Sequence, residues 1–277
     1  MRLSKVLTAT AFAGVMALAA TGPASATTVG GITFPAGAVF KSTNIFENVV
    51  TAAGQVLDGI GFVNNISATG GTPVWSNGDN GRELTFQFAG YTVEKIIAVS
   101  LVSSRILFSG GTVDFYSDSA QNFTDTSGTQ ATDIARATDT DLSGAWLNLV
   151  GAATNTFTCD AAAACFSGVG TAITLDSTVF FNGDLGTVTS GTGIGFLDVV
   201  GGLAAGNFDT NSQPSGQDIL LGSNFAGDQS GTSDFPITGT ADLRSTAIPE
   251  PGTLALFGFG LLGLGFAARR RRRKLAA

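Results

Sequence analysis

The residue types that most enzymes use for catalysis are scarce in this chain of 277 residues. It contains no histidine, which excludes Ser-His-Asp and Cys-His arrangements and removes the commonest general base. No G-x-S-x-G elbow and no P-loop occurs in it. Its carboxylates could supply the pair that glycoside hydrolysis needs, but their spacing singles out no two of them. We therefore predict a protein that is not an enzyme and has no catalytic residues.

Oxygen-bearing side chains gather in one tight loop, at residues 77–81, with Glu83 just beyond it. Hard cations such as Ca²⁺ prefer carboxylate and amide oxygens. Asn77, Asp79 and Glu83 are therefore the candidate metal ligands, and calcium is the candidate cofactor. The run lacks the spacing of an EF-hand, and an ordinary hairpin turn uses the same residue types.

Cys159 and Cys165 are the only cysteines of the chain. In an exported protein, two cysteines this close predict a disulfide that closes a small loop. A metal site would need further ligands, and zinc and copper would lack their commonest partner, histidine.

The body is rich in Gly, Thr, Ser, Asn and Asp and poor in Glu, Lys and Arg, which favours strands and turns over helices. Residues 84–88 alternate in polarity, and Val93, Ile97, Val99 and Leu101 are expected on one strand face. Gly110-Gly111 is typical of a turn, whereas residues 124–141 lack apolar periodicity and predict a long loop.

These patterns predict an all-β fold, a single antiparallel β-sandwich of jelly-roll or immunoglobulin type with long polar loops. A barrel is the alternative. The predicted domain covers residues 27–238, and residues 239–247 are expected to form a tether. An N-terminal signal helix and a C-terminal transmembrane helix complete the expected organisation.

The N-terminus has the pattern of a secretory signal peptide. Arg2 and Lys5 precede an uncharged stretch from Val6 to Ala20, and small residues follow at Ala24 and Ala26. This order is that of a charged n-region, an apolar h-region and a cleavage site. We predict cleavage after Ala26 and a mature chain that begins at Thr27.

The C-terminus has three parts in a fixed order. Pro249-Glu250-Pro251 comes first, and an uncharged run up to Ala268 follows it. The run would be about 25 Å long as a helix, close to the hydrocarbon thickness of about 30 Å. The last part consists of cations that should stay on the cytoplasmic side: Arg269, Arg270, Arg271, Arg272, Arg273 and Lys274. The body is therefore expected outside the inner membrane.

At these C-terminal residues the chain resembles the PEP-CTERM proteins of Gram-negative bacteria, which are substrates of exosortases. The resemblance covers residues 248–277 and implies a route rather than a fold. Signal peptidase and exosortase would act on the chain in transit, and Pro249, Glu250 and Pro251 would form the processing motif. The implied precursor crosses the inner membrane once, transiently, before the body reaches the cell surface or extracellular matrix.

Charge limits the partners of the exported body. Between Thr27 and Ile248 the chain has twenty acidic and six basic residues, a net charge near −14, which argues against nucleic acid. We expect a structural or adhesive protein of exopolysaccharide, biofilm or floc. The alternative is a carbohydrate-binding module with calcium-ordered loops, in which Trp75, Tyr91, Tyr116 and Trp146 could stack on sugar rings.

Overall fold

The computed structural model describes residues 26–123, 129–153, 173–213, 216–228 and 234–246. The predicted signal helix, the C-terminal span, Cys159 and Cys165 lie outside these residues. In the described part of the chain, the helices are all too short or too polar to cross a bilayer. Strand β1 starts at Thr27, the residue that was predicted as the first of the mature chain.

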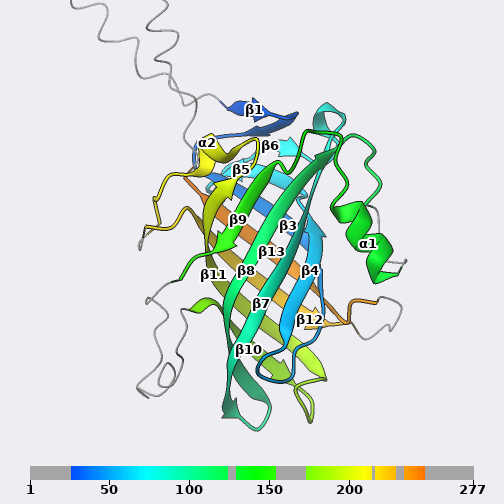
Figure 1. The fold of residues 1–277 in the computed structure, drawn as a ribbon, viewed down its shortest axis with the longest axis vertical. Coiled ribbons are helices and arrows are strands. Elements are labelled where there is room, and N and C mark those ends of the chain that lie inside the picture. Colours follow the sequence, from blue (N-terminus) through cyan, green and yellow to red (C-terminus); the bar gives the residue numbers. More distant parts are fainter. Residues whose placement is uncertain (1–25, 124–128, 154–172, 214–215, 229–233, 247–277) are drawn as a thin grey trace, which may run out of the picture.

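Strands form most of the described chain, and three short helices accompany them (Figure 1). The strands are β1 (Thr27–Val29), β2 (Ile32–Phe34), β3 (Ala38–Glu47), β4 (Val56–Phe62), β5 (Asn65–Ala68), β6 (Pro73–Ser76), β7 (Glu83–Ser100), β8 (Ser103–Asp118), β9 (Leu147–Gly151), β10 (Ile173–Phe181), β11 (Val188–Gly201), β12 (Ile219–Gly227) and β13 (Ile237–Ser245). The helices are η1 (Asp79–Gly81), α1 (Gln130–Ala137) and α2 (Ala205–Phe208). The all-β, antiparallel prediction is confirmed.

The large sheet closes on itself. Its strands follow the order β3-β4-β7-β8-β10-β11-β12-β13, and β13 pairs with β3. β9 continues the position of β10, because both pair with β8 on one side and β11 on the other. One closed sheet therefore replaces the two open sheets of the predicted sandwich. Both architectures need the same inside-outside alternation, so the sequence pattern did not distinguish them.

Strand β13 closes the ring, although the predicted boundary between domain and tether fell inside it. β13 includes residues 239–245, which were predicted as a tether. Its inward side chains are Ile237, Ala241 and Leu243, all buried, but Gly239 interrupts the apolar alternation. The alternation of apolar residues in β13 is too weak to predict a strand. Hydrogen bonding to both β12 and β3 stabilises the strand instead.

The turn predicted at Gly110-Gly111 is absent, because these residues lie inside strand β8 of the long β7–β8 hairpin. Gly110 and Gly111 have φ values of 67° and 87° and lie inside β8. A Cβ atom on Gly111 would lie 2.4 Å from the ring of Tyr91, so this glycine lets the tyrosine fold inward. A register shift between Val93 and Lys95 changes the alternation of β7. Ile96 consequently joins the inner cluster, while Ile97 packs in an outer one.

Helix α1 lies against the outside of the ring, within residues 124–141 that were predicted as a loop (Figure 1). Thr129 caps it by accepting a hydrogen bond from the Thr132 N–H. Ala137 joins an outer cluster with Ile60, Phe123 and Phe235. The helix has few apolar residues, so its stability depends on this tertiary contact. The periodicity of the sequence does not predict such a contact.

Strands β1 and β2 and helix α2 lie at one end of the ring (Figure 1). Aromatic side chains fill the interior at this end. The ring centroid of Phe34 lies 4.8 Å from Phe208 and 5.8 Å from Trp146, and that of Phe40 lies 5.4 Å from Phe208. The indole Nε1 of Trp146 donates a 2.9 Å hydrogen bond to the carbonyl of Val29. This end of the interior is solid core.

Candidate ligand-binding cavity

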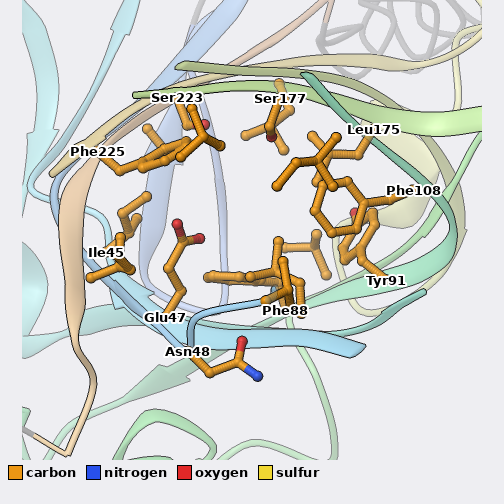
Figure 2. Close-up of a pocket in the computed structure, with 18 of the residues that line it drawn as sticks. Ile45, Glu47, Asn48, Phe88, Tyr91, Phe108, Leu175, Ser177, Ser223 and Phe225 are labelled. Carbon is orange, nitrogen blue, oxygen red and sulfur yellow. The ribbon is translucent and has the colours of Figure 1, made fainter. Parts of the chain in front are cut away.

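The opposite end of the ring is hollow. A partly open cavity of about 70 Å³ lies between the strands there (Figure 2). Its lining is mostly apolar and consists of Ile45, Glu47, Asn48, Val49, Val50, Leu57, Phe86, Phe88, Tyr91, Ile106, Phe108, Val113, Leu175, Ser177, Val179, Val188, Leu221, Ser223, Phe225, Ile237, Ala241 and Leu243. Asn48, Val49 and Val50 follow β3, and Val188 begins β11, so the cavity reaches the end of the ring away from α2.

The cavity exists because one wall carries small residues. Ser177, Gly193, Ser223 and Ala241 are consecutive cross-strand partners on β10, β11, β12 and β13. Large aromatic rings line the wall formed by β7 and β8, as Figure 2 shows. Eight strands leave an interior that side chains can fill completely or that can hold one small ligand. The row of small residues leaves space here.

Aromatic rings cover Gly59 and Gly191, two other inward glycines, but no ring covers Gly193. A Cβ atom on Gly59 would lie 2.2 Å from Cζ of Phe88, and one on Gly191 would lie 2.2 Å from Cε2 of Phe225. At Gly193 the nearest atoms are the hydroxyl oxygens of Ser223 and Ser177, at 2.6 and 3.2 Å. Rings therefore occupy the space over Gly59 and Gly191, whereas the nearest groups beside Gly193 are small hydroxyl groups.

Glu47 points its carboxyl group into this space (Figure 2). It is the last residue of β3 and shares the inward face with Ile45. Its side chain is 7% exposed, and the lining includes no lysine or arginine. Burial raises the pKa of Glu47 from 4.5 to about 8, because removal from water penalises the charged form. The carboxyl group is therefore mainly protonated at neutral pH.

Tyr91 is the second polar group of the cavity. It is 2% exposed, and its hydroxyl group has no hydrogen-bond partner among the described residues. Burial raises the pKa of this phenol further above its ordinary value. The site thus combines an apolar lining with a few uncharged polar groups: Glu47, Tyr91, Ser177 and Ser223. This composition is typical of small-molecule sites.

The cavity is poorly suited to carboxylate catalysis. Glycoside hydrolysis uses two carboxyl groups, about 5 to 9.5 Å apart, on either side of the scissile bond. Glu47 is the single carboxylate among the lining residues. The arrangement can bind and orient a molecule, and it provides no acid–base pair.

The candidate calcium ligands do not form one site in the structure. The carboxylate of Asp79 accepts a 2.7 Å hydrogen bond from the Ser76 N–H. Glu83 is 1% exposed and accepts hydrogen bonds from the N–H groups of Asn122 and Phe123. The carboxylates are thus engaged by different backbone segments. Over the described ranges, no group of three Asp, Glu, His or Cys residues is arranged to hold a metal ion.

The four aromatic residues considered for sugar stacking are largely internal. Trp75, Tyr91 and Trp146 are 1, 2 and 0% exposed, and Tyr116 is half-buried. Within the described residues, these side chains therefore make no exposed planar strip. The buried rings of Trp75, Tyr91 and Trp146 belong to the packed core.

Sequence reasoning missed the cavity and Glu47. A visible signal was the run Gly191-Thr192-Gly193-Ile194-Gly195, in which every second residue is glycine. On a strand these three glycines share one face, so they remove all side chains from that face. A glutamate directly after Ile45 and Phe46 was a further sign of an inward carboxyl group. Both signals become specific only when the closed ring is known.

The C-terminal residues are the part of the chain that matches a known family. Residues 247–273 match the family described as the PEP-CTERM protein-sorting motif. The chain carries a PEP-CTERM sorting tail. The match begins two residues after β13 ends at Ser245, so in sequence the PEP-CTERM tail directly follows the closed domain.

The PEP-CTERM match includes the predicted processing residues Pro249, Glu250 and Pro251 and the arginines at positions 269–273. Such a motif indicates an exported protein whose C-terminal signal is processed by exosortase. No curated protein and no solved structure matches the chain. The family match therefore concerns residues 247–273 alone.

Proposed function

We propose that the protein is a non-catalytic structural or adhesive component of the cell surface or the exopolysaccharide matrix, as in a biofilm or floc. The sorting motif at residues 247–273 is the observation that supports this role. The precursor is cleaved after Ala26, held transiently in the inner membrane by its C-terminal span, and released by exosortase near Pro249-Glu250-Pro251.

The body is suited to life outside the cell. Among the described strands, the eight that form the ring each pair on both sides, since β13 pairs with β3, and exposed edges are the usual starting points of aggregation. The acidic surface, with twenty acidic and six basic residues from Thr27 to Ile248, favours solubility. The predicted disulfide between Cys159 and Cys165 would further constrain the chain in an oxidising compartment.

The carbohydrate-binding alternative has less support. Its aromatic platform would need exposed rings, and three of the four candidate side chains are buried. Its calcium-ordered loop would need Asp79 and Glu83 to bind the same ion. The carboxylate of Asp79 instead accepts a hydrogen bond from the backbone of residue 76, and that of Glu83 from residues 122 and 123. Calcium binding at this loop stays a proposal, and calcium titration monitored by calorimetry would test it.

Removal of residues 248–277 should prevent correct delivery, because this segment contains both the processing motif and the membrane span. In cells that express the truncated chain, we expect the body to be missing from the surface fraction and to accumulate elsewhere. Immunoblots of surface, membrane and medium fractions would measure the distribution.

Deletion of Ala276 and Ala277 alone is the matched control, since these residues lie beyond the matched motif. This short deletion should leave delivery unchanged. Equal surface delivery of the chain that lacks residues 248–277 would show that sorting does not depend on the tail.

A further inference from the structure

We propose that the hollow end of the ring binds a slender aliphatic molecule that carries one uncharged hydroxyl or carbonyl head group. The site lies inside the closed sheet, and it is independent of the proposed sorting and surface role. Its walls are the aromatic residues of β7 and β8 and the small residues of β10 to β13.

The size of the cavity selects the shape of the ligand. A volume of about 70 Å³ exceeds the roughly 10–15 Å³ that one water molecule needs. It is below the roughly 150 Å³ of an engineered cavity that binds benzene. An alkyl chain fits such a space, with its remainder in the open end, whereas a fused ring system does not.

The lining favours an apolar occupant over water. A buried water molecule typically makes about three hydrogen bonds, and most of the lining side chains offer none. Phe86, Phe88, Phe108, Leu175 and Phe225 instead present hydrocarbon surface. Burial of each methylene group against such surface strengthens binding about fourfold, so a chain of several methylene groups would bind measurably.

The polar groups of the cavity select the head group. A protonated Glu47 can donate one hydrogen bond and accept others, and the unpartnered hydroxyl of Tyr91 can donate one. A hydroxyl or carbonyl oxygen matches both. No cation lines the cavity to pair with a carboxylate head group. An ammonium head group would require Glu47 to ionise and both charges to lose their water, which is costly.

Methyl NMR of the isotope-labelled protein, recovered from the surface of the producing cells, tests the site. Titration with 1-octanol should shift the methyl signals of Ile45 and Leu175, which line the cavity, to a saturating value. Leu107 and Ile173, which pack in the outer cluster, should not follow. The absence of a saturable shift, or equal shifts at inner and outer methyl groups, would overturn the proposal.

A matched pair of substitutions on β12 locates the binding. Ser223→Leu replaces one hydroxyl oxygen in the cavity with three carbon atoms and should weaken 1-octanol binding about tenfold or more, a difference of about 1.4 kcal/mol. Asn224→Leu adds a leucine to the exposed side of the same strand and should change the affinity less than about twofold. Unchanged signals of Leu107 and Ile173 in both variants would show that the fold is intact. Equal affinities of the two variants would contradict binding inside the ring.

The head group is tested with ligands of equal chain length. 1-Octanol should bind more tightly than octylammonium or octanoate at neutral pH. Glu47→Leu should weaken 1-octanol binding about fivefold, since one hydrogen bond contributes about 1 kcal/mol, whereas Glu47→Gln should retain it. Tighter binding of octylammonium to the wild type, or full affinity of Glu47→Leu for 1-octanol, would refute the uncharged head group.

Discussion

Replacement of Glu47 with glutamine is expected to stabilise the protein by roughly 3 kcal/mol at pH 7. The variant and the wild type should have similar stability near pH 4.5. The change keeps the shape of the neutral carboxyl group and removes its ability to ionise. Chemical unfolding at a series of pH values, followed by fluorescence or circular dichroism, would measure the difference.

The sign of this effect follows from proton binding. Burial raises the pKa of Glu47 from 4.5 to about 8 in the folded protein, so between these pH values the native state binds more protons than the unfolded state. Stability must then fall as pH rises through this window, by about 1.4 kcal/mol per pH unit. The full loss between pH 4.5 and 8 amounts to about 5 kcal/mol. No such loss occurs below pH 4.5, where both states are protonated.

The difference in stability between the wild type and Glu47→Gln reports the titration of Glu47 alone. Burial also raises the pKa of Glu83 and Asp198, but these residues contribute equally to the wild type and the variant. Tyr91, the other titratable residue of the lining, stays neutral throughout this window because its pKa is raised. A stability difference that does not change between pH 4.5 and 8 would show that Glu47 is not buried as described.

Gly59→Ala is expected to destabilise the fold by about 3 kcal/mol. The new Cβ atom would lie 2.2 Å from Cζ of Phe88 and 2.4 Å from the carbonyl oxygen of Phe46. The carbonyl belongs to the paired strand β3 and cannot move without disturbing the ring. Because Phe88 lines the cavity, its displacement should also change the methyl signals of neighbouring lining residues.

Gly222→Ala is the matched control for this effect. Gly222 lies on β12, and an added Cβ atom would have no neighbour within 4 Å. Neither Gly222 nor Gly59 has a positive φ, so backbone strain does not distinguish them. Thermal unfolding should show a clear loss for Gly59→Ala and a change of less than about 1 kcal/mol for Gly222→Ala. Equal effects would indicate that the ring of Phe88 does not cover Gly59.

The strand content could be predicted because alternation is local. Leu84 and Phe86 face the interior as their spacing indicates. Alternation fails at Ile96 and Ile97, where the register shift of β7 reverses the faces. A bulge of this kind depends on the partner strand, so the sequence of β7 alone does not reveal it.

Closure and cavity could not be predicted because they depend on contacts between distant residues. The pairing of Arg244 with Val39 joins opposite ends of the domain, and no local pattern records it. The hollow depends on Gly193 meeting Ser177 and Ser223, residues from two neighbouring strands. Pro249 and Arg269, by contrast, could be interpreted from sequence because the sorting tail is recognised as a linear order of segments.

The most direct test of the account is the intact mass of the protein recovered from the surface and medium of cells with and without their exosortase. With exosortase, we predict a chain that begins at Thr27 and ends near Pro249-Glu250-Pro251. Without it, the chain should begin at Thr27 and retain every residue to Ala277. Recovery of the full C-terminus from cells that contain exosortase would contradict the proposed route.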